Sequence, residues 1–64
     1  MNHHAALDRW QPGMMTFYVP THAQGNLYHQ DVEQGIVTRV TNQYVFVRFG
    51  GETTSKACSP RDLR

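Results

Sequence analysis

The clearest pattern of apolar and polar positions lies in residues 35–49, GIVTRVTNQYVFVRF. Residues 36–40 and 44–49 are rich in β-branched and aromatic side chains, which favour β-strands. Between them, Thr41-Asn42-Gln43 predicts a tight turn in which Asn42 is suited to a left-handed backbone conformation. The pattern therefore predicts a β-hairpin, and Gly35 at its entrance allows a bulge or a close crossing of strands.

Side chains alternate between the two faces of a strand, so the pattern also predicts which residues are buried. The segment MMTFYVP, residues 14–20, alternates in the same way and predicts a further strand that Pro20 ends. The residues predicted to fill the core are Met15, Phe17, Val19, Val45, Val47 and Phe49. The residues predicted to face outward are Tyr18, Tyr44, Phe46 and Arg48.

The second half of the chain predicts two more short elements. Gly50-Gly51 ends the hairpin, and residues 55–58 predict a short strand. Ser59 is placed to cap a single helical turn that begins at Pro60. Together the elements predict an all-β fold of about five short antiparallel strands. Because an open sheet of this size exposes its edges, we expect the strands to close into a small SH3-like barrel.

The domain organisation follows from length and turn signals. A chain of 64 residues accommodates one domain with a small core. Pro12-Gly13 predicts a boundary between a flexible N-terminal arm, residues 1–11, and the barrel domain, residues 12–64. Trp10 is expected to pin the arm against the fold. Residues 21–34 predict a long polar loop.

The amino-acid composition argues against several classes of function. The formal net charge of +1 argues against a strong nucleic-acid footprint, although residues 35–64 are net basic and residues 1–34 net acidic. The single cysteine, Cys58, excludes an internal disulfide framework. No apolar run approaches the ~20 residues of a membrane helix, and the start of the chain lacks the pattern of a secretory signal. We therefore expect no membrane contact and a cytoplasmic location.

Three groups of residues carry a resemblance to known proteins. They are Gly35-x-Val37, then Val45-Phe46-Val47-Arg48-Phe49, and finally Ala57-Cys58-x-Pro60-x-Asp62-Leu63. This pattern resembles small SH3-like domains of the Tudor and KOW kind. The longer run from Phe17 to Leu63 resembles short uncharacterised proteins encoded by bacteriophages and prophages. The resemblance implies an origin in a phage or prophage genome and action in the bacterial host cytoplasm, and it implies no particular activity.

Four residues are candidate metal ligands: His22, His29, Asp31 and Cys58. The spacing of the two histidines matches no recognised ligand pattern, and no Cys-x2-Cys pair accompanies them. We therefore expect these side chains to stabilise turns in the loop, with no metal and no cofactor. Cys58 is expected to pack at the end of the barrel rather than to act as a nucleophile.

The outward aromatic and basic residues are the stronger functional signal. The predicted binding residues are Tyr18, Tyr28, Arg39, Tyr44, Phe46 and Arg48. Tyrosine and arginine are enriched in protein interfaces, so the sequence predicts a non-enzymatic binding module for a host or phage protein. Aromatic rings that stack on bases beside arginines would instead bind nucleic acid.

Other interpretations stay open at this stage. A homodimer would bury the same aromatic side chains, and so would a strongly bent barrel that packs Phe46 beneath the long loop or the Trp10 arm. Plasmid-borne dihydrofolate reductases show that an SH3-like barrel can catalyse, but their Val-Gln-Ile-Tyr motif is absent from this chain. An enzyme is therefore not expected.

Overall fold

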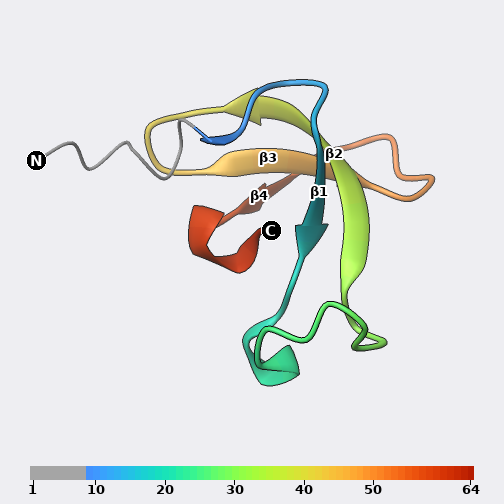
Figure 1. The fold of residues 1–64 in the computed structure, drawn as a ribbon. Coiled ribbons are helices and arrows are strands. Elements are labelled where there is room, and N and C mark those ends of the chain that lie inside the picture. Colours follow the sequence, from blue (N-terminus) through green and yellow to red (C-terminus); the bar gives the residue numbers. More distant parts are fainter. Residues whose placement is uncertain (1–8) are drawn as a thin grey trace, which may run out of the picture.

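A computed structural model describes residues 9–64 of the chain. The prediction of a flexible arm falls mainly on residues 1–8, which lie outside the described residues. Within residues 9–64, four strands form one antiparallel sheet in the order β1-β2-β3-β4 (Figure 1). The strands are β1 (Met15–Tyr18), β2 (Glu33–Val40), β3 (Val45–Phe49) and β4 (Lys56–Cys58). The prediction of an all-β antiparallel fold is confirmed.

The predicted hairpin is the pair β2–β3, in which Gly35 lies opposite Phe49 and Val40 opposite Val45. The strand β2 begins at Glu33 and is thus longer than predicted. Its register shifts between Val37 and Arg39, which marks an irregularity where the strand bends (Figure 1).

The turn of the hairpin differs from the prediction in one respect. Among the described residues other than glycine, only Gln24 has a positive φ, so the left-handed conformation predicted for Asn42 is wrong. The side chain of Thr41 holds the turn instead. Its hydroxyl accepts hydrogen bonds from the backbone N–H groups of Gln43 and Tyr44, at 3.3 and 3.1 Å. A threonine at this position stabilises a turn without requiring a positive φ from its neighbours.

The core lies on the inner face of β2 and β3. Its buried residues are Trp10, Val37, Val45, Val47, Phe49, Cys58 and Leu63. The face predicted for β3 is confirmed, because its valines and Phe49 are buried and Arg48 is exposed. Trp10 is only 6% exposed, so it packs into the fold as expected.

The faces predicted for β1 are wrong. Thr16 is buried, whereas Met15 is 54% exposed and Phe17 is half-buried. Tyr18 was predicted to face outward but packs against the core, with its ring edge toward Phe49 at a centroid distance of 6.2 Å. Only Val19, which directly follows the strand, is buried as predicted.

Contacts with distant residues explain the reversal. The indole Nε1–H of Trp10 donates to the hydroxyl of Thr16 at 3.2 Å. That hydroxyl in turn donates to the carbonyl oxygen of Arg64 at 3.0 Å. Because both partners satisfy the buried hydroxyl, Thr16 can occupy an inner position that its polarity alone would disfavour.

The C-terminal segment completes the fold. A 3-10 helix, η3 (Pro60–Asp62), begins at Pro60 as predicted, but the side chain of Ser59 makes no capping hydrogen bond. Leu63 then forms an isolated antiparallel bridge with Tyr18. The backbone N–H and carbonyl of Phe17 also exchange hydrogen bonds with Arg64, at 3.0 and 2.8 Å. The strand β1 therefore has β2 on one side and the C-terminal residues on the other (Figure 1).

No helix within residues 9–64 has the length and apolar character needed to cross a membrane.

Candidate functional site

The outward side of the β2–β3 hairpin carries the residues that the sequence analysis singled out. Arg39 lies opposite Phe46 in the register. Its guanidinium carbon is 4.4 Å from the centre of the Phe46 ring, a distance that allows a cation–π interaction. Arg48 is exposed two residues further along β3, and Tyr44, which precedes the strand, is 45% exposed. The structure thus places four of the six predicted binding residues on one hairpin.

Sequence reasoning missed two apolar residues that extend this surface. Met15 of β1 lies opposite Ile36 of β2, and Ile36 lies opposite Arg48 of β3. Both Met15 and Ile36 are exposed. Met15 was missed because the faces of β1 were reversed. We call the combined surface the outer face, and its residues are Met15, Ile36, Arg39, Tyr44, Phe46 and Arg48.

The outer face is not flat. A hollow of about 360 Å³ opens on it, and its lining includes Gln34, Ile36 and Arg48. The side-chain amide of Gln34 also contacts the sulfur of Met15 at 2.6 Å, which joins β1 to the rim of this hollow. A hollow bordered by apolar and cationic side chains can receive a protruding side chain of a partner.

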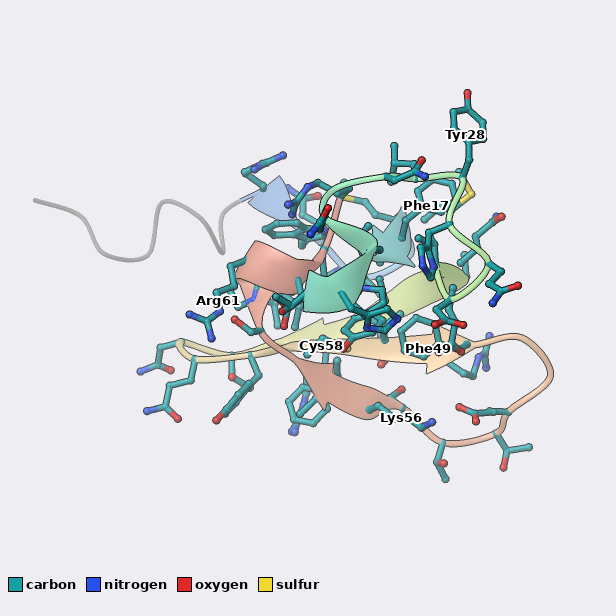
Figure 2. All side chains as sticks on the ribbon, turned by 90° about the horizontal axis from the view of Figure 1, so that it is seen from below. Phe17, Tyr28, Phe49, Lys56, Cys58 and Arg61 are labelled. Atoms are coloured by element: carbon teal, nitrogen blue, oxygen red, sulfur yellow. The ribbon has the colours of Figure 1, made fainter. Side chains whose placement is uncertain are left out.

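The two remaining predicted residues lie elsewhere. Tyr18 faces the interior, as described above. Tyr28 is 97% exposed in the loop between β1 and β2, and its side chain projects away from the molecule (Figure 2). Its backbone N–H donates to the side-chain oxygen of Asn26 at 3.0 Å, so the backbone at this position is held in a turn.

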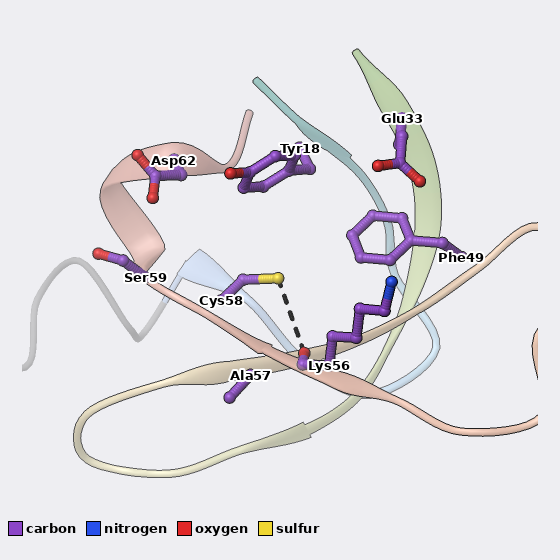
Figure 3. Close-up of a pocket in the computed structure, with 8 residues that line it drawn as sticks. All are labelled: Tyr18, Glu33, Phe49, Lys56, Ala57, Cys58, Ser59 and Asp62. Atoms are coloured by element: carbon purple, nitrogen blue, oxygen red, sulfur yellow. Dashed lines mark hydrogen bonds between the residues drawn. The ribbon is translucent and has the colours of Figure 1, made fainter. Parts of the chain in front are cut away.

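A pocket of about 330 Å³ lies on the other side of the sheet, between β4, η3 and the end of β1 (Figure 3). Its lining residues are Tyr18, Glu33, Phe49, Lys56, Ala57, Cys58, Ser59 and Asp62. The thiol of Cys58 points into it and donates a weak hydrogen bond to the carbonyl oxygen of Lys56 at 3.6 Å.

The surroundings of Cys58 keep it protonated. Burial raises the pKa of the thiol, and the carboxylate of Asp62 raises it further. The ammonium group of Lys56 lowers this pKa, whereas Glu33 raises it. A raised pKa disfavours the thiolate that a nucleophilic cysteine requires. Cys58 is 7% exposed, so its expected packing in the core is confirmed.

Three of the four candidate metal ligands meet in the loop between β1 and β2. His22 lies in the 3-10 helix η2 (Thr21–Ala23), and His29 and Asp31 lie in the turns that follow. One potential ligand atom from each residue lies within 4.8 Å of the others. Cys58 does not belong to this group. The loop therefore gathers ligand types that the spacing in the sequence did not predict to be close.

Comparisons with known proteins give no further guidance. No protein-family model, no curated protein and no solved structure matches this chain.

Proposed function

We propose that the protein is a non-enzymatic binding module whose outer face holds a protein partner. The observation that carries the proposal is the exposure of Met15, Ile36 and Tyr44 beside two arginines on one side of the sheet. Methionine, aromatic residues and arginine are enriched where proteins meet. The guanidinium group of Arg39 stacks on the ring of Phe46, so a positive charge and an apolar surface lie side by side. This arrangement suits a partner with acidic and apolar side chains.

The fold proposed for this module is a small SH3-like barrel. The bridge between Leu63 and Tyr18 supports closure, because it gives β1 a second neighbour opposite β2. Leu63, which the sequence analysis placed at the final helical turn, would then supply the position of a fifth strand. The origin in a phage or prophage genome and action in the bacterial cytoplasm stay predictions from the resemblance.

To test the proposal, a partner protein is captured from a bacterial lysate and purified, and its affinity for variants of this protein is measured. Arg48→Glu reverses a charge on the outer face, and Arg61→Glu makes the same change at an exposed position of η3. We expect Arg48→Glu to weaken binding of the purified partner about thirty-fold, since removing an interface hot spot costs roughly 2 kcal/mol. Arg61→Glu should leave the affinity unchanged. Equal binding by wild-type protein and the Arg48→Glu variant would remove the outer face as the site.

Nucleic acid is the second candidate, because Arg39 and Arg48 both lie on the side of the sheet that presents Phe46. Fluorescence anisotropy with single- and double-stranded oligonucleotides at two salt concentrations separates it from a protein partner. Phosphate contacts release counterions, so affinity for nucleic acid would fall steeply as salt rises. An absence of binding at low salt would leave the protein partner. Light scattering at high concentration would reveal self-association, and loss of the larger species in the Arg48→Glu variant would assign it to the outer face.

A further inference from the structure

The loop between β1 and β2 is a series of tight turns rather than a loose connection. The backbone N–H of Asn26 donates to the carbonyl of Ala23, that of His29 to Asn26, and that of Val32 to His29. All three hydrogen bonds are 3.0–3.1 Å long. Because each turn restricts the backbone, His29 and Asp31 are held near η2 although six residues lie between His22 and His29 along the chain.

The three side chains have the separations of a partly formed coordination sphere. His22 Nε2 lies 2.7 Å from Asp31 Oδ2, and His29 Nδ1 lies 4.0 Å from the same oxygen. The two imidazole rings are 5.2 Å apart and nearly perpendicular. Ligand atoms around a tetrahedral zinc ion lie about 3.3 Å apart, because each is roughly 2.0–2.1 Å from the metal. These two separations lie on either side of this value, and all three candidate ligand atoms lie within 4.8 Å of one another, so side-chain rotation can bring them around one ion.

We propose that His22, His29 and Asp31 bind one divalent transition-metal ion of the zinc class. Two imidazoles and one carboxylate form a donor set that suits zinc better than magnesium or calcium, which prefer oxygen ligands. Water would complete the coordination, since His22 and Asp31 are exposed to solvent. The site is separate from the outer face, so its test is independent of the proposed function.

Two existing contacts must change when the ion binds. The hydrogen bond of 2.7 Å between His22 Nε2 and Asp31 Oδ2 would be replaced by bonds from both atoms to the metal. His29 Nδ1 accepts a hydrogen bond from the backbone N–H of Asp31 at 3.0 Å. A metal ion on this nitrogen would replace that bond, and an ion on the opposite nitrogen would require the ring to turn. Binding should therefore alter the environment of the Asp31 amide, which gives the proposal a spectroscopic signature at a defined position.

Zinc titration of the full chain by calorimetry tests the proposal. Because the imidazoles of His3 and His4 are also able to bind zinc, both are replaced by alanine in every protein compared. We expect one zinc ion per chain in this background. His22→Gln and Asp31→Asn should each weaken the affinity at least about ten-fold, since even residues that only support metal ligands contribute about 10–100-fold. Asp62→Asn removes a carboxylate outside the cluster and should leave the affinity unchanged.

An amide-resolved nuclear magnetic resonance titration completes the test and shows whether each variant is folded. Zinc should shift the amide signals of His22, His29 and Asp31 before those of the outer face. Magnesium at the same concentration should leave them unshifted. Equal zinc affinity of the protein with alanine at positions 3 and 4 and of its Asp31→Asn variant, or the absence of saturable binding, would overturn the proposal. The histidine–aspartate contact would then be an ordinary surface ion pair.

Discussion

At the scale of single residues, Gly35 shows most clearly how the sequence determines packing. A Cβ atom at this position would lie 2.5 Å from Val47 Cγ1 and 2.8 Å from the carbonyl oxygen of Arg48. It would also lie 2.8 Å from Phe49 Cδ1. The absence of a side chain therefore lets β2 and β3 approach closely beneath two core residues. The close crossing expected from the sequence at Gly35 is confirmed, whereas the register shift occurs further along the strand.

Gly35→Ala should therefore destabilise the protein. The methyl group would meet a backbone carbonyl that cannot rotate away, so we expect a loss of about 1–3 kcal/mol, the usual cost of overpacking a core. Urea unfolding measures this loss. Gly51→Ala is the matched control, because a Cβ there meets no atom within 4 Å. If the two variants had equal stability, the close approach of the strands at Gly35 would not matter energetically.

At the scale of elements, both β1 and β3 could be predicted as strands from the sequence, but the buried face could be predicted only for β3. In β3 two valines and Phe49 are buried on one face, and the other face carries the half-buried Phe46 and the exposed Arg48, so the single charged residue marks the outer face. In β1 the alternation places the more apolar Met15 and Phe17 on one face and Thr16 and Tyr18 on the other, so it favours the wrong face as the buried one. Contacts from Trp10 and Arg64 decide which face is buried. These partners lie outside the strand, so a pattern within the strand contains no information about them.

The same reasoning explains how much of the candidate site could be predicted. The shared face of Phe46 and Arg48 follows from the alternation along β3. The pairing of Arg39 with Phe46 instead depends on the register shift between Val37 and Arg39, which the sequence did not indicate. The cluster of His22, His29 and Asp31 depends on a succession of turns, including a left-handed residue at Gln24. Glutamine gives no strong signal for that conformation, so spacing along the chain did not reveal the cluster.

Thr16→Val tests the contact that orients β1. Valine keeps the shape of threonine but neither accepts the indole N–H of Trp10 nor donates to the carbonyl of Arg64. The buried N–H of Trp10 would lose its hydrogen bond, and the part-buried carbonyl of Arg64 would keep only the one from Phe17, so we expect a loss of about 1–3 kcal/mol. Fluorescence of Trp10, the single tryptophan, reports urea unfolding directly.

Thr54→Val is the control for this substitution. Thr54 is exposed, so the change should alter stability by less than about 0.5 kcal/mol. A Thr16→Val protein as stable as the wild type would mean that apolar packing alone orients the strand.

At the scale of the whole molecule, stability depends on joining the two ends of the described chain. Trp10 and Leu63 belong to one core cluster, and Leu63 is only 1% exposed. A domain of this length buries only about 60% of the surface of its unfolded chain, so each buried residue carries a large share of the stability. Leu63 also aligns the backbone that pairs with β1. The edge of β1 that does not pair with β2 is therefore covered by the short C-terminal segment that contains Leu63.

Leu63→Ala should be among the most damaging substitutions in the chain. Truncating a buried leucine costs about 2–5 kcal/mol, compared with roughly 5–15 kcal/mol for the total stability of a typical domain. Leu27→Ala is the matched control, because Leu27 is 47% exposed and its truncation should cost less than about 1 kcal/mol.

Hydrogen exchange distinguishes loss of packing from loss of the backbone bridge between Leu63 and Tyr18. If Leu63 fastens β1, the amides of Phe17 and Val19 should lose protection before those of β3, since these two donate to Arg64 and Asp62. Leu63→Met nearly conserves the side-chain volume, so the amides of Phe17 and Val19 should stay protected in this variant. It provides a folded protein for comparison if the alanine variant does not fold. Equal losses for the two alanine variants would mean that the C-terminal segment does not hold β1, and the proposed barrel would lose its main support.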